Sequence, residues 1–378
     1  MKSLFKYLED IYNKLPSLAQ LDCNTCQIIK QIEFKELIDD DKKCLKLISS
    51  TIEFPAQTLS INQHRASHII VTWILGVGLS DFVKDGQALT GLANLYETRI
   101  WLETAMIHDY GYFCQEIKKC LPIENLTKDY NLLTDNYDID ILQCLNNLST
   151  NQNYSCFFSY SYVEIKNYYH YIQSWHQSLK NNSVSSNESF DDFSDHGIVG
   201  GCKAFSKYCK HIATENKYNK PSDVITIIQK LSCINAASHN IFKSSPEKDK
   251  KYIEAGLGDL TSESPSRITR TNFFLSLLSL VDTIECVKRF SKKDNPREYL
   301  IQSTILDKVD FESNINTISI NFNRLDRFIS NDRKSNKMKQ KLKQHIDAIT
   351  KLDEWTDFKA IRNCNDKNLI TISFKDRN

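Results

Sequence analysis

The sequence predicts a mainly α-helical protein that carries a small α+β region at its C-terminal end. Apolar residues recur at helical spacing over most of the chain up to Pro296. Beyond Pro296, short stretches alternate β-branched and polar residues, which is typical of strands. No predicted strand is followed by a glycine-rich phosphate loop, so the pattern does not favour Rossmann or P-loop chemistry.

The predicted helices follow one another along the chain, with prolines and polar loops between them. The helix over residues 68–79 is apolar all round, so we expect it to be fully buried. A Ser, Asn and Asp tract over 181–195 and a charged stretch over 243–267 predict loops, and we expect both to form the rim of a site. The spacing predicts helices over residues 2–15, 25–51, 68–79, 95–109, 139–148, 160–179, 224–240 and 272–290, strands over 317–321 and 369–374, and an amphipathic helix over 337–355.

These patterns predict three regions in a chain of 378 residues. Residues 1–58 form an N-terminal helical region, residues 59–295 the main helical domain, and residues 296–378 a small α+β appendage. The 48 Lys and Arg nearly balance the 47 Asp and Glu, so no global field draws the protein to nucleic acid or to an anionic membrane. The most apolar run, 69–79, is too short to span a bilayer. The 12 cysteines are scattered without paired spacing, which favours a reduced, cytoplasmic location.

Five short stretches place His and Asp at the ends of apolar helices or inside one. An Asp at a buried position is rare unless it is paired or bound to a metal ion. Imidazole and carboxylate groups that face one cavity from helix ends form transition-metal sites in helical bundles. The stretches are His64-Arg65-Ala66-Ser67-His68, His108-Asp109-Tyr110-Gly111-Tyr112, Asp195-His196-Gly197, Ser238-His239-Asn240 and Val281-Asp282.

In the order of these motifs the sequence resembles the HD superfamily of metal-dependent phosphohydrolases. The pattern of that family is a His, then a His-Asp dyad, then a later Asp, and its binuclear members add two further His. The resemblance covers roughly residues 60 to 290 and implies a helical HD-domain bundle. The implied metal ligands are His68, His108, Asp109, His196, His239 and Asp282. The family resemblance predicts that these six side chains converge on one point.

The resemblance also implies a mechanism and a substrate class. Two divalent transition-metal ions, Mn, Fe, Co or Zn, would be held with Asp109 as the bridging carboxylate, and Mg is less natural for this donor set. A metal-activated hydroxide would then attack the phosphorus of a nucleotide or another small phosphate compound, as in a phosphohydrolase or phosphodiesterase. Phe113 follows Gly111-Tyr112, so the Gly-Tyr-Pro signature of the cyclic-di-GMP subgroup is absent.

Further residues near the motifs have a functional and a structural interpretation. His64 lies one helical turn before His68 and is either a catalytic general acid or phosphate contact, or a surface histidine. Candidate substrate-binding residues are Arg65, Tyr112, Asn240, Arg270 and Arg289, with ion pairing or core packing as the structural interpretation. The other histidines, His170, His176, His211 and His345, have no ligand spacing and are interpreted as structural.

Two alternative functions stay open at the level of sequence. A branch of the superfamily that resembles inositol oxygenases uses the same ligand set for di-iron oxygen chemistry. A non-catalytic, ligand-sensing HD protein would also retain the site. The basic stretch over 334–343 is flanked by Asp332 and Asp347, which favours a solvated helix face over a nucleic-acid surface. No protein partner is indicated.

Overall fold

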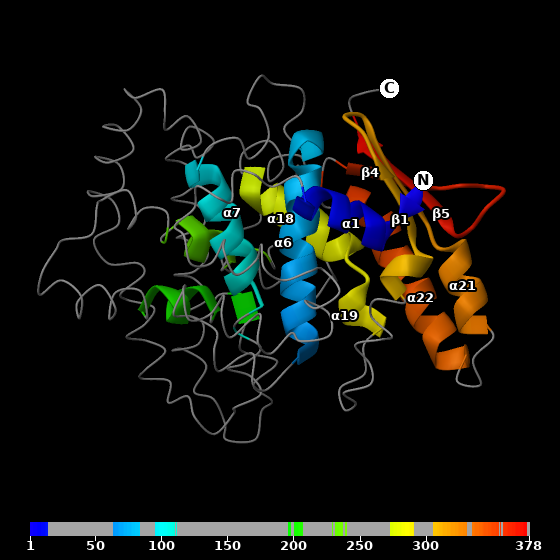
Figure 1. Ribbon diagram of the computed structural model, residues 1–378, viewed down its shortest axis with the longest axis horizontal. Helices are drawn as coiled ribbons and strands as arrows, with labels where there is room; N and C mark the ends of the chain where they lie inside the picture. Colours follow the sequence, from blue (N-terminus) through cyan, green and yellow to red (C-terminus); the bar gives the residue numbers. More distant parts are fainter. Residues whose placement is uncertain are drawn as a thin grey trace, which may run out of the picture. The chain divides into compact units, whose positions relative to one another are not determined.

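The computed structural model describes part of the chain, and its residues belong to two compact units (Figure 1). The sheet unit comprises residues 1–95 and 276–378, and the helical unit comprises residues 96–275. The described residues are 1–13, 63–83, 95–109, 111, 196–197, 200–206, 229, 231–236, 239, 273–290, 305–330, 335–354, 356 and 358–375.

The sheet unit contains a five-stranded antiparallel sheet with the strand order β1-β2-β3-β5-β4. The central pair is held in register by isoleucines, since Ile318 pairs with Ile372 and Ile320 with Ile370. These four side chains are buried on one face, and the residues between them are partly exposed. This alternation confirms the two predicted strands. The strands are β1 (Lys2–Ser3), β2 (Asp310–Ser313), β3 (Thr317–Asn321), β4 (Phe358–Arg362) and β5 (Leu369–Phe374).

Helices from both ends of the chain pack in the sheet unit. The rings of Phe82 and Phe374 lie 5.0 Å apart, centroid to centroid, and join helix α6 to strand β5. Helix α22 contacts β4, and α19 contacts both α6 and α22. The helices are α1 (Leu4–Asn13), α6 (Gln63–Val83), α19 (Val287–Phe290), α21 (Asn323–Ser330) and α22 (Ser335–Thr350), with the short 3₁₀ helix η5 (Leu352–Glu354). The C-terminal region is thus α+β, as predicted.

The N-terminal residues belong to the same sheet as the C-terminal strands, although no pattern in the sequence predicts this pairing. Lys2 pairs with Phe311, and the backbone N–H of Leu4 donates to the carbonyl of Val309 at 2.7 Å. Helix α1 then packs on α6 at Gly78, where an added Cβ would lie 2.2 Å from Ile11 Cδ1. The predicted boundaries at residues 58 and 295 stay a prediction.

The longest described helix of the helical unit is α7 (Leu95–Ile107). A second helical segment over 231–236 is joined to it by polar contacts: Ser232 Oγ donates to the carbonyl of Ile100, and Asn235 Nδ2 donates to Thr104 Oγ1, both at 3.3 Å. A third segment lies over residues 200–206. The mainly helical character of the prediction is therefore confirmed, and an HD-type bundle stays a prediction.

Helix α18 (Phe273–Ile284) ends earlier than predicted. The sequence predicts one helix over 272–290, but α18 and α19 are separated by Glu285 and Cys286. The side-chain oxygen Oε1 of Glu285 accepts the backbone N–H of Val287 at 2.5 Å, which caps the new helix. Side chain to backbone bonding of this kind competes with a continuous helical ladder.

Several predictions fall outside the described residues: the helices over 25–51, 139–148 and 160–179, and the loops over 181–195 and 243–267. In the part of the chain that the structure describes, no helix has both the length and the apolar character that a membrane span requires.

Candidate metal centre

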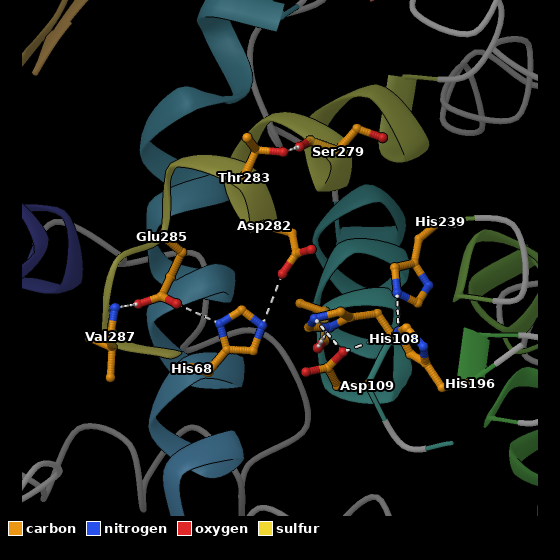
Figure 2. A network of polar contacts seen from close by, with 11 residues as sticks. His68, His108, Asp109, His196, His239, Ser279, Asp282, Thr283, Glu285 and Val287 are labelled. Atoms are coloured by element: carbon orange, nitrogen blue, oxygen red, sulfur yellow. Dashed lines mark hydrogen bonds and ion pairs between the residues drawn. The ribbon is translucent and has the colours of Figure 1, made fainter. Parts of the chain in front are cut away.

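In the sheet unit, helices α6 and α18 bring His68 and Asp282 together (Figure 2). The distance from His68 Nε2 to Asp282 Oδ1 is 3.0 Å. The imidazole is fully buried, while the Asp282 side chain keeps 28% of its surface exposed. Both residues lie on predominantly apolar helices, where a polar or charged side chain is uncommon unless it has a partner. The structure thus pairs the first and the last ligand of the predicted set.

Glu285 is the partner of His68 that sequence reasoning missed. Its Oε2 lies 2.6 Å from His68 Nδ1, and both side chains are fully buried. The next residue, Cys286, is also buried, and burial raises the pKa of its thiol well above the usual value, with the charge of Glu285 adding to the shift. Burial therefore favours the neutral thiol of Cys286, which is a weak nucleophile. A signal for Glu285 exists in the sequence, since an acidic residue within an apolar run needs a buried partner.

In the helical unit, His108 and Asp109 follow the last turn of α7 and are both fully buried. The carbonyl of Ala105 accepts a hydrogen bond from His108 Nδ1 at 2.7 Å. A carbonyl can only accept, so Nδ1 carries the hydrogen and Nε2 of the neutral ring has a lone pair. Nε2 lies 3.7 Å from Asp109 Oδ1. The end of the helix therefore provides both the acceptor and the turn that orient the dyad.

His196 and His239 meet Asp109 in the same unit (Figure 2). The two Nε2 atoms lie 3.0 Å apart, and His196 Nε2 is 3.6 Å from Asp109 Oδ1. His239 repeats the arrangement of His108, because its Nδ1 donates to the carbonyl of Ala236 at 2.6 Å. One ligand atom from each of Asp109, His196 and His239 lies within 4.8 Å of the other two. Residues far apart in the sequence therefore present three donor atoms to one point.

Two glycines in the predicted motifs allow this close approach. A Cβ at Gly197 would lie 2.7 Å from the carbonyl oxygen of Ala236 and 2.8 Å from His239 Nδ1. A Cβ at Gly111 would lie 1.7 Å from the backbone oxygen of His196. Any larger residue would push the histidine-bearing segments apart. The Gly in His196-Gly197 and in Tyr110-Gly111 is thus explained by packing at the site.

The donor atoms in the helical unit fit a transition-metal ion. Two nitrogens that each lie about 2.0–2.1 Å from one ion are separated by about 2.9–3.4 Å in octahedral or tetrahedral geometry. The 3.0 Å between His196 and His239 falls in this range. A hydrogen bond between the two rings accounts for the same distance in metal-free protein. Two imidazoles with one carboxylate match Zn, Fe, Mn or Co better than Mg.

Other predicted site residues are not all described. Arg289 is exposed, and its positive charge acts on His345 in helix α22. Helix α6 includes His64 and Arg65 in its backbone, but their side chains lie outside the described part of the chain. Tyr112, Asn240 and Arg270 also lie outside it.

Comparison with protein-family models, curated proteins and solved structures finds no match to this chain.

Proposed function

We propose that the protein is a metal-dependent phosphohydrolase or phosphodiesterase that acts on a nucleotide or another small phosphate compound. The observation that carries the proposal is the meeting of Asp109, His196 and His239, with two Nε2 atoms 3.0 Å apart. These residues come from three separate motifs, and their order in the chain is the order that the sequence resemblance requires.

The proposal assigns metal ligands in both units of the chain. In the helical unit they are His108, Asp109, His196 and His239, and in the sheet unit His68 and Asp282. When bound, divalent cations would activate a water molecule and stabilise charge on phosphoryl oxygens. That all six ligands serve one binuclear centre stays a prediction from the resemblance.

The chain's own groups have distinct tasks in this proposal. Asp109 supplies negative charge that offsets the repulsion between cations, because its carboxylate is fully buried and little screened by water. The backbone carbonyls of Ala105 and Ala236 hold Nε2 of His108 and His239 free of hydrogen and ready to bind a cation. His64 remains assigned as the general acid or phosphate contact.

One feature of the helical unit favours a second candidate function. Asp109, His196 and His239 form a set of two histidines and one carboxylate, which is also typical of non-haem iron(II) oxygenases. This donor set favours oxygen chemistry at iron, and the resemblance to inositol oxygenases implies its di-iron form, so this is the alternative that the experiment must separate from hydrolysis. A ligand-sensing protein without turnover is the third outcome.

The decisive experiment begins with metal analysis of protein purified without chelator. We expect bound Mn, Fe, Co or Zn, and hydrolysis of at least one member of a panel of phosphomonoesters, nucleoside phosphates and cyclic nucleotides. Asp109→Asn keeps the shape of the side chain and removes its charge, so both metal content and turnover should be lost. Asp81→Asn, at the exposed end of the same helix as His68, is the matched control and should retain both.

Three further results test the residue roles and the choice between hydrolase and oxygenase. His64→Ala should keep its metal and lower the rate about 10²–10⁴-fold, the usual range for positioned proton transfer. Oxygen consumption by the iron-loaded protein without hydrolysis of any phosphate compound would transfer the assignment to the oxygenase. Full metal content in Asp109→Asn would contradict the role of Asp109 as a ligand.

A further inference from the structure

Glu285 occupies an unusual position for a carboxylate. It lies in the break between α18 and α19, and its side chain is fully buried. A buried carboxylate is costly unless its oxygens are hydrogen-bonded. Here both are used: Oε1 accepts the backbone N–H of Val287 at 2.5 Å, and Oε2 faces His68 Nδ1 at 2.6 Å. The fold therefore places a carboxylate, both of whose oxygens are hydrogen-bonded, beside Nδ1 of His68, a predicted metal ligand.

The position of His68 in its helix explains why it needs such a partner. His108 and His239 lie just beyond helical segments, where carbonyls are left over, and their Nδ1 atoms use the carbonyls of Ala105 and Ala236. His68 lies inside α6, where each carbonyl is engaged by the N–H four residues later. No spare carbonyl of its own helix is available to it. A side chain from another element must therefore orient this ring.

The hydrogen on the ring follows from the chemistry of the acceptor. An ionised carboxylate has no hydrogen to donate, so the 2.6 Å contact requires one on Nδ1 of His68. This holds for the neutral ring and for the charged ring alike. The other ring nitrogen, Nε2, lies 3.0 Å from Asp282 Oδ1 and is the atom that would coordinate a cation.

We propose that Glu285 is a positioning residue that keeps the hydrogen of His68 on Nδ1 and so reserves Nε2 for the metal ion. The proposal deepens the proposed function and rests on it for the identity of His68 as a ligand. The carboxylate would also make the imidazole a stronger donor, as carboxylate partners of metal-bound histidines do. Removal of such a partner lowers metal affinity about 10–100-fold.

The substitution Glu285→Gln tests this arrangement with little change in shape. The N–H of Val287 can only donate, so the amide oxygen of the new Gln must face Val287. Its NH₂ group then points to His68 and donates to Nδ1. The ring is forced into the opposite tautomer, with its hydrogen on Nε2, and the atom that should bind metal is blocked. Glu285→Gln thus reverses the hydrogen bond while it keeps the helix cap.

Nitrogen NMR of ¹⁵N-histidine-labelled full-length protein reads the tautomer without any need for activity. The His68 signals are assigned by their loss in His68→Gln. We expect a hydrogen on Nδ1 in the wild type, and its shift to Nε2 in Glu285→Gln. Thr283→Val is the matched control, because it removes a hydrogen bond from Thr283 Oγ1 to the carbonyl of Ser279 in the same helix and leaves His68 untouched. This control should keep the wild-type spectrum.

Zinc affinity, measured by competition with a chromogenic chelator, gives the second readout. We expect Glu285→Gln to bind zinc about 10–100-fold more weakly than the wild type, and Thr283→Val to bind it normally. A wild-type ring without hydrogen on Nδ1, or unchanged tautomer and zinc affinity in Glu285→Gln, would overturn the proposal. A wild type that binds zinc but hydrolyses no phosphate compound refutes the proposed function alone, since the tautomer and affinity readouts still decide the role of Glu285.

Discussion

Replacement of His345 by leucine should make the protein more stable, and the gain should grow as the pH falls. His345 lies in α22 of the sheet unit and has no exposed surface. Its ring meets Phe322 and Phe290 edge-on, with centroid distances of 5.5 and 6.2 Å. Within the described part of the chain, neither ring nitrogen makes a hydrogen bond of good geometry, and a contact with the backbone of Ile284 offsets only part of the cost of charging the ring. Leucine fills a similar volume and removes two polar atoms from an apolar site.

The size of the effect follows from the pKa of the imidazole. Burial, and then the positive charge of Arg289, lower the pKa of His345 from 6.5 to about 3. The folded state therefore keeps this ring neutral down to about pH 3, whereas the unfolded chain takes up a proton below pH 6.5. A depressed histidine pKa thus destabilises the fold between these two values as the pH falls. At pH 5 the unfolded state gains about 2 kcal/mol from this proton, since one pKa unit is worth about 1.4 kcal/mol.

Hydrogen exchange of the α22 amides, measured at pH 7.5 and pH 5.0, gives the free energy of opening for this part of the protein. The wild type should lose about 2 kcal/mol between the two pH values through this single group. His345→Leu should lack that loss, so the difference between variant and wild type should be about 2 kcal/mol larger at pH 5.0. At pH 7.5 the variant should already gain about 1 kcal/mol from the removal of buried polar atoms that lack a hydrogen bond of good geometry.

The matched control is Gln344→Leu, which places the same side chain on the exposed side of α22. This control should change the stability at pH 7.5 by no more than about 0.5 kcal/mol. It should leave the pH dependence of the stability as in the wild type. Equal pH dependence of His345→Leu and the wild type would refute the reasoning, because it would mean that His345 titrates alike in the folded and unfolded states.

Two further substitutions test the packing of each unit. Gly197→Ala should destabilise the helical unit by about 1–3 kcal/mol and weaken zinc binding, because its Cβ would lie 2.7 Å from the carbonyl of Ala236 and 2.8 Å from His239 Nδ1. Urea unfolding and zinc competition check this, and unchanged values would contradict it. Tyr7→Phe should cost about 1 kcal/mol, because it removes a hydroxyl that donates to the carbonyl of Gly78 at 3.2 Å and contacts Ser313 Oγ at 2.5 Å. Unaltered thermal unfolding of the sheet unit would show that this bond contributes nothing.

The helices near the candidate site could be predicted because their signals are local. The apolar run over 68–79 lies within α6. The pattern over 95–109 corresponds to α7, which ends at Ile107, so that the His108-Asp109 dyad lies just beyond the helix. Helical periodicity depends on neighbours three and four residues apart, so it can be read without knowledge of the fold. The ends were less accurate: α6 begins at Gln63, five positions before the predicted start at His68.

The candidate ligands were also accessible from the sequence, since ionisable residues on apolar helices need a buried partner. The structure pairs His68 with Asp282 and brings Asp109 to His196 and His239. Glu285 was missed because its role depends on where α18 breaks, and that break is decided by a hydrogen bond rather than by an apolar pattern.

The pairing of β1 with β2 shows what lies beyond a local pattern. Two residues, Lys2 and Ser3, are too few to show alternation, and they become a strand only because β2 offers them a free edge. Strand β4 was not predicted either, and its register against β5 comes from contacts between residues such as Phe358 and Phe374.

The helical character of the chain, the α+β nature of its C-terminal region and the residue types available for a metal centre could all be predicted without a structure. These depend on side-chain chemistry and on short-range periodicity. Which groups become neighbours depends on the packing of the folded chain: the carboxylate behind His68, the glycines that let His239 approach, and the apolar surroundings of His345. The reason is that such partnerships join residues far apart in the chain, and they form only when whole elements pack to bury their apolar faces.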